Sequence, residues 1–227
     1  MPRFPGRSSR RRLLALALLA LASAFGVGLV VLRAYLSGGW HYGNLLPNLV
    51  LAWVPLGLAL LAYDRARRGA RPAELALPLA AWLLFLPNAP YLLTEYKLLR
   101  EVDDMPLWFD VTMLTVFAWT GLMLGFVSVF LVQGIARRAA GNLAGWICAV
   151  GSLAASGPGI YLGRSLRWNS WDLAVQPANV LGDVLTRLDS PRLLGMSLTL
   201  GAFLTLAYLM LYAMLEAALE ERAERPR

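Results

Sequence analysis

The chain has 227 residues, of which 58% are hydrophobic and only 15% charged, and its net charge is +7. An ordinary soluble domain is about 45–50% apolar, so this composition excludes a soluble globular protein and favours a helical membrane bundle. The single cysteine, Cys148, and the single histidine, His41, exclude an internal disulfide, a Cys/His zinc site and bis-histidine haem ligation within one chain.

Six apolar segments are long enough to cross a bilayer, which requires about 20 residues. In chain order they are Leu13–Leu32, Leu45–Tyr63, Leu75–Leu93, Val111–Ile135, Leu143–Gly163 and Leu193–Leu215. Residues 1–12 form a basic cytoplasmic tail, residues 13–215 a single transmembrane domain, and residues 216–227 a charged cytoplasmic tail. The sequence therefore predicts an all-α integral membrane bundle of six transmembrane helices.

The first segment has a second interpretation. Arg10–Arg12 followed by Leu13–Leu21 and the small residues 22–24 resembles a cleavable signal peptide. The apolar run continues to Leu32, however, which is long enough to span the membrane. We favour an uncleaved first helix, and cleavage would leave five helices.

The basic residues predict the orientation. Of the 21 Lys and Arg residues, 14 lie in the two tails and in the second and fourth loops, and seven lie in the other loops. Positive charge accumulates on the cytoplasmic side of membrane proteins. Both termini are therefore expected in the cytoplasm, with the chain in the cell (inner) membrane. The net positive charge follows from this topology and does not indicate nucleic-acid binding.

Helix breakers interrupt the third and fifth segments. Pro87 frees the carbonyl of Leu83, and the sequence Gly157-Pro158-Gly159 frees that of Ala154. We predict that both helices are broken in the outer leaflet. Asn88 could satisfy the freed carbonyls, either as part of a broken helix that lines a polar cavity or as a self-satisfied amide at a simple kink.

Three polar stretches, residues 86–95, 108–110 and 157–172, fall at the same outer end of this topology. The candidate acid–base residues are Glu95 and Asp110. The candidate substrate-binding residues are Asn88, Tyr91, Thr94, Tyr161, Arg164, Arg167, Asn169 and Asp172.

Each of these charged residues has a simpler interpretation. Arg164 and Arg167 lie three residues apart, so they share a helix face and suit a phosphate or carboxylate, or they pair with Asp172, Asp110 or Glu95. Asp110 precedes the fourth helix and suits an N-cap.

The same stretches resemble an uncharacterised bacterial multi-pass membrane family that is catalogued as a domain of unknown function. The resemblance rests on residues 87–91 with 94–95, on residues 108–110, and on residues 159–164 with 167–172, and it covers roughly residues 40 to 215. Family members often carry Asp at the position of Glu95 and a histidine a few residues later, where this chain has Lys97-Leu98-Leu99. The resemblance implies a membrane protein and a site, but no reaction.

Three classes of function follow. The first is a protein with an extracytoplasmic-facing polar pocket that binds or moves a small solute or lipid. The second is an enzyme in which Arg164 and Arg167 hold a phosphate-bearing or lipid-linked substrate while Glu95 or Asp110 acts as base. The third is an accessory subunit that docks a partner. The expected partners are the lipid bilayer and a small solute or lipid headgroup, with no nucleic acid, no cofactor and no metal. A nucleotide motif is absent, which argues against transport driven by nucleotide hydrolysis within this chain.

Overall fold

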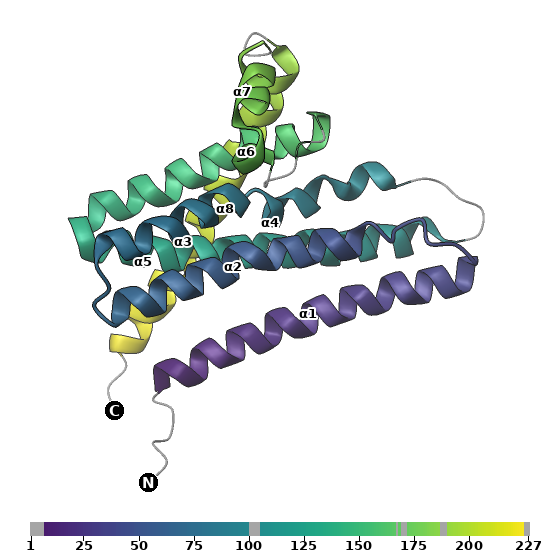
Figure 1. Cartoon of the computed structure of the whole chain (residues 1–227). Helices are drawn as coiled ribbons and strands as arrows, with labels where there is room; N and C mark the ends of the chain where they lie inside the picture. Colours follow the sequence, from purple (N-terminus) through teal and green to yellow (C-terminus); the bar gives the residue numbers. More distant parts are fainter. Residues whose placement is uncertain (1–6, 100–104, 167, 169–171, 187–189, 225–227) are drawn as a thin grey trace.

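The computed structural model describes residues 7–99, 105–166, 168, 172–186 and 190–224 (Figure 1). Over these residues the chain is helical throughout and contains five long apolar helical stretches, each long enough to cross a membrane. In chain order the elements are α1 (Arg7–Ser37), α2 (Leu45–Arg67), α3 (Pro72–Phe85), α4 (Asn88–Tyr91), the 3₁₀ helix η1 (Leu92–Leu98), α5 (Leu107–Tyr161), the π-helix η2 (Leu162–Leu166), α6 (Asp172–Val175), α7 (Pro177–Leu185) and α8 (Pro191–Glu224).

The longest helix, α5, is folded back on itself. Ala140 (φ −142°, ψ 18°) and Gly141 (φ 86°, ψ 178°) leave the helical conformation. A positive φ of this size suits glycine because it lacks a β-carbon. The chain reverses direction there, so residues 107–139 form a first arm and residues 142–161 a second arm (Figure 1). The two predicted segments Val111–Ile135 and Leu143–Gly163 correspond to these two arms.

The first arm of α5 is the centre of the bundle. In the most apolar stretch of α5, 61% of the residues are buried, against 17% in α1 and 22% in α8. One core cluster joins α1 and α2 to this arm around Phe117, and a second joins α3, both arms and α8 around Phe126. The outer faces of α1 and α8 expose large apolar side chains such as Phe25 and Met210, which is the pattern expected of surfaces that face lipid.

The two predicted helix breakers behave differently. The third apolar segment is interrupted: α3 ends at Phe85, residues 86–87 form a turn, and α4 begins at Asn88. The Nδ2 atom of Asn88 donates a hydrogen bond to the carbonyl of Phe85 at 2.9 Å. The asparagine therefore satisfies the end of α3. The carbonyl that it reaches is neither of the two predicted, that of Leu83, freed by Pro87, or that of Leu86, freed by Pro90.

The predicted break at Gly157-Pro158-Gly159 is wrong at that position. The second arm of α5 continues as an α-helix through Pro158 to Tyr161, and its winding changes only at Leu162, where η2 begins. The two glycines instead permit close packing. A β-carbon on Gly157 would lie 2.2 Å from the backbone oxygen of Ser197 in α8, and one on Gly159 would lie 2.5 Å from Cγ of Pro87.

The bundle carries polar contacts at two opposite ends. At one end Arg12 of α1 pairs with Asp64 of α2 through two hydrogen bonds of 2.6 and 2.9 Å, and the fold of α5 at Ala140 lies near this end (Figure 1). We call it the turn end. The other end carries Asp110, Glu95 and Arg164, and we call it the site end.

Candidate functional site

Arg164 is the centre of a polar network at the site end. It lies on the π-helix η2, and its Nη1 atom donates to Oε1 of Glu95 at 3.0 Å and to the hydroxyl of Tyr91 at 3.2 Å. Its Nη2 atom donates to the backbone carbonyl of Thr94, and the guanidinium lies 5.2 Å from the centre of the Tyr91 ring. Helical segments of π type are rare and frequently mark functional sites.

Glu95 is held from a second side by α2. The Nδ2 atoms of Asn44 and Asn48 donate to its Oε2 and Oε1 atoms at 3.3 and 3.1 Å. The two asparagines are four residues apart and so share a helix face. The Glu95 side chain is only 1% exposed and that of Arg164 9% exposed. These six residues, Asn44, Asn48, Tyr91, Thr94, Glu95 and Arg164, are the Arg164 network.

A second buried ion pair lies at the same end. Nε and Nη2 of Arg33 donate to Oδ1 and Oδ2 of Asp110 at 3.2 and 3.4 Å, and the Tyr42 hydroxyl donates to Oδ2 at 2.8 Å. Asp110 is therefore not the predicted N-cap. Helix α5 begins earlier, at Leu107 after the cap residue Pro106, so Asp110 lies in its first turn and turns towards Arg33.

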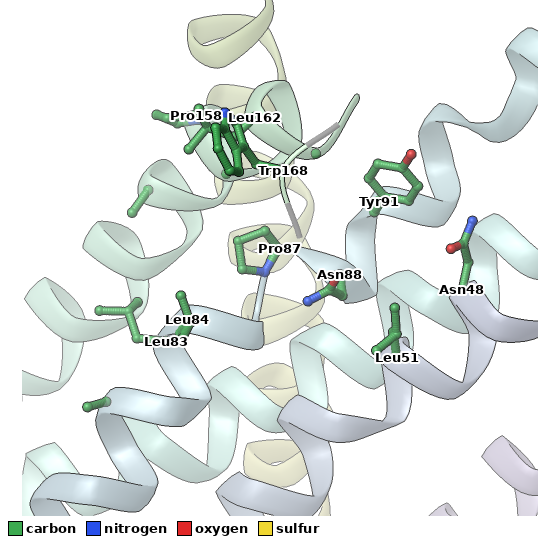
Figure 2. Close-up of a pocket in the computed structure, with 14 residues that line it drawn as sticks. Asn48, Leu51, Leu83, Leu84, Pro87, Asn88, Tyr91, Pro158, Leu162 and Trp168 are labelled. Atoms are coloured by element: carbon green, nitrogen blue, oxygen red, sulfur yellow. The ribbon is translucent and has the colours of Figure 1, made fainter. Parts of the chain in front are cut away.

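The pocket beside the Arg164 network has a volume of about 490 Å³, within the range of about 300–1,000 Å³ typical of small-molecule sites. Its walls come from α2, α3, the α3–α4 turn, α4, α5, η2 and Trp168. Figure 2 shows Leu83, Leu84 and Pro87 on one side and Pro158, Leu162 and Trp168 on the other. The lining residues are Asn48, Leu51, Ala80, Leu83, Leu84, Pro87, Asn88, Tyr91, Ala155, Pro158, Gly159, Leu162, Gly163 and Trp168.

Apolar side chains form most of the pocket wall, and the polar ones gather where it meets the Arg164 network. Asn88 and Tyr91 line the pocket, as does Asn48, whose amide also holds Glu95. The indole Nε1 of Trp168 donates to Oδ2 of Asp183 at 2.9 Å, which fixes the ring at the pocket edge. The arrangement has an apolar body with a polar end, so it suits an amphipathic molecule better than a fully hydrated ion.

The other predicted site residues have separate positions. The Thr94 hydroxyl donates to the carbonyl of Tyr91 at 2.7 Å. Tyr161 is buried, 7% exposed, and does not line the pocket. Asp172 is half-buried at the start of α6. Arg167 and Asn169 lie outside the described residues.

Glu95 and Asp110 lie in separate polar clusters. Each carboxylate is paired with its own arginine, and within the described parts of the chain no hydrogen bond or ion pair joins the two. Over the same residues, no three His, Cys, Asp or Glu side chains gather as metal ligands. Arg164 already donates to three groups of the protein, and the Glu95 carboxylate at 3.0 Å balances its charge.

Four residues of the Arg164 network and the Asp110 cluster lie outside the predicted set of site residues: Asn44, Asn48, Arg33 and Tyr42. The sequence does contain a signal for Asn44 and Asn48. Two amide side chains one helical turn apart at the end of an apolar helix are costly in lipid unless they have polar partners, so the pair indicates a buried polar group nearby. Arg33 was assigned to a loop because it follows the apolar run 13–32. Helix α1 in fact continues to Ser37, which carries Arg33 into the bundle.

Comparison with known proteins gives one match. The model of a family described as "Protein of unknown function (DUF1361)" matches residues 47–207, well over half of the chain. The matched range includes every residue that lines the pocket and excludes Arg33, Tyr42 and Asn44. Neither the curated proteins nor the solved structures contain a match to this chain.

Proposed function

The chain belongs to the DUF1361 family, whose function is unknown, and on that premise we propose that it is a multi-pass membrane protein that binds an amphipathic, lipid-like molecule in the pocket beside Arg164. The observation that carries this proposal is the pocket itself. It has a volume of about 490 Å³, apolar walls, and a polar end beside Asn48, Asn88 and Tyr91.

Six crossings of the membrane follow if α5 crosses twice. A straight helix over Leu107–Leu166, 60 residues long, would be about 90 Å long at 1.5 Å per residue, roughly three times the thickness of the hydrocarbon core. The fold at Ala140–Gly141 divides this length into two spans. The distribution of Lys and Arg then puts the turn end and both termini in the cytoplasm of a bacterial cell and the site end outside.

The pocket opens towards the side of the bundle. Ala80 and Leu83 of α3 and Ala155 and Pro158 of α5 line it and are also exposed. In a bilayer these residues would contact hydrocarbon. A lipid-like molecule would therefore enter sideways from the membrane, with its apolar part following α3.

The polar end supports an uncharged or zwitterionic headgroup. The Tyr91 hydroxyl accepts a hydrogen bond from Arg164 and retains its own proton to donate. Arg164 carries the only positive charge in its network, and Glu95 balances it at 3.0 Å. This balance favours binding or movement of a lipid-like molecule over the alternative of an enzyme that uses Arg164 to hold a phosphate.

A pair of tryptophan variants tests the proposal. Ala80 and Ala76 are both exposed on α3, one turn apart, but only Ala80 lines the pocket. We expect Ala80→Trp to fill the pocket mouth and to remove the lipid-like molecules that native mass spectrometry detects on the protein extracted from membranes. The matched control Ala76→Trp should retain them.

Retention of these molecules by both variants would contradict the proposal. If both variants retain the same molecules as the parent protein, the pocket is not the binding site. An accessory role, in which the outer loops dock a partner, would then replace the proposal.

A further inference from the structure

We infer that the turn end carries a separate site for the phosphate headgroup of an anionic phospholipid, formed by Arg67 and Arg138, which both contact the ring of Tyr63. This site lies at the opposite end of the bundle from the pocket. It rests on the proposed membrane orientation but not on the ligand proposed for the pocket. The three residues come from helices that are distant in sequence, α2 and the first arm of α5.

Tyr63 holds both guanidiniums. The guanidinium carbon of Arg67 lies 6.0 Å and that of Arg138 5.2 Å from the centre of the Tyr63 ring. Nη2 of Arg138 also donates to the Tyr63 hydroxyl at 3.3 Å. Cation–π contacts of this kind hold a guanidinium in place while leaving its outer N–H groups available.

The charges of these two arginines are not balanced by ion pairs. Among the described residues neither Arg67 nor Arg138 lies within 4.0 Å of a carboxylate oxygen. Asp64, the acidic residue next to Tyr63, is engaged by Arg12 through two hydrogen bonds. Two like charges beside one ring repel each other, and an anion that contacts both arginines reduces that repulsion.

The surroundings add to the attraction for an anion. Exposed arginines dominate this end. The C-terminus of α2 is the negative end of its helix dipole and opposes an anion, so the attraction comes from the arginine side chains. The exposed arginines of the second and fourth loops are Arg65, Arg67, Arg68, Arg71, Arg137 and Arg138.

A lipid, rather than free phosphate, fits the position of the site. Leu60 lies two helical turns before Arg67, and Leu131 lies two turns before Arg138, so each leucine shares a face with its arginine. Both leucines are half-buried, so part of each apolar side chain remains exposed on the same face as its arginine, where an acyl chain would lie. Guanidiniums bind phosphate oxygens through paired hydrogen bonds, and basic sites between helices on the cytoplasmic side bind anionic headgroups.

The test measures binding of phosphatidylglycerol and phosphatidylcholine to the full-length protein by native mass spectrometry. In the double variant Arg67→Gln/Arg138→Gln we expect phosphatidylglycerol affinity to fall more than about tenfold, because two charged contacts to the headgroup are lost. The control Arg65→Gln/Arg71→Gln removes the same charge from the same end and should lose markedly less. Equal loss in the two double variants would mean that only the general surface charge attracts the lipid, and would overturn the site.

A charge-neutral variant gives an independent test. Tyr63→Leu removes the ring that holds both guanidiniums without changing the net charge, so phosphatidylglycerol binding should weaken several-fold while phosphatidylcholine binding is unchanged. Unchanged phosphatidylglycerol binding in Tyr63→Leu would contradict the inference. Displacement of the lipid by millimolar inorganic phosphate would show that the site takes the free ion, and would overturn the lipid as its occupant.

Discussion

Arg33, near the C-terminal end of α1, and Asp110, in the first turn of α5, form an ion pair whose side chains are only 1% and 2% exposed. The pair connects the least buried long helix to the most buried one. Tyr42, in the loop after α1, adds a third contact to the same carboxylate. Because both charges are out of contact with water, neither is tolerated without the other.

The first prediction concerns this pair. Arg33→Met leaves the Asp110 carboxylate buried without its counter-charge, and we expect a loss of about 3–5 kcal/mol in the free energy of unfolding. The double variant Arg33→Met/Asp110→Leu removes both charges and should recover most of that loss. Denaturant unfolding in detergent measures both. A double variant that is as unstable as the sum of the two single variants would show that the pair contributes no coupling.

Hydropathy and charge predict the membrane-spanning helices of this chain, but they do not predict which side chains pair between helices. The long apolar helices and the reversal between segments four and five follow from hydropathy and the basic residues at 137–138, because a bilayer fixes the length of a span. The partner of Arg164 does not follow. Asp172, Asp110 and Glu95 were equally good candidates, and only the three-dimensional path of η1 and η2 selects Glu95.

Arg33 and Asp110 illustrate the same difficulty. A charged residue just after an apolar run is usually at the membrane surface, so the sequence assigns Arg33 to a loop. Its burial depends on an additional turn of α1 and on the early start of α5 at Leu107, and helix ends are the least reliable part of any sequence-based assignment.

The second prediction tests whether Arg164 is available to anions. Glu95→Gln keeps the size of the side chain but removes its charge, so Arg164 loses its counter-ion. We expect the variant to be less stable than the parent and to regain part of its melting temperature in phosphate, because the anion replaces the carboxylate. The parent should not respond to phosphate. A parent that is stabilised as strongly as the variant would support the enzyme alternative, in which Arg164 binds a phosphate-bearing substrate.

The third prediction uses two glycines of the second arm of α5. A β-carbon on Gly157 would lie 2.2 Å from the backbone oxygen of Ser197, whereas one on Gly151 meets nothing within 4 Å. Gly157→Ala should therefore separate α5 from α8 and cost about 1–3 kcal/mol. Gly151→Ala is the matched control and should be neutral or slightly stabilising, since alanine favours a helix by up to about 1 kcal/mol over glycine. Thermal unfolding gives the melting temperature of each variant. Equal melting temperatures for Gly157→Ala and Gly151→Ala would contradict the close contact between α5 and α8.

The fourth prediction tests whether α5 crosses the membrane twice. Cys148 is the only cysteine, so Cys148→Ala gives a background without thiols. Ala139 lies at the fold of α5 and Ser165 lies on η2 at the site end, and both are exposed. In spheroplasts, we expect a membrane-impermeant maleimide to label Ser165→Cys at once and Ala139→Cys only after the membrane is opened. This result would mean that the second arm of α5 crosses the membrane between the fold, on the inner side, and Ser165, on the outer side. Labelling of both cysteines from outside would put the fold of α5 on the same face as Arg164, and the six-span topology would then be wrong.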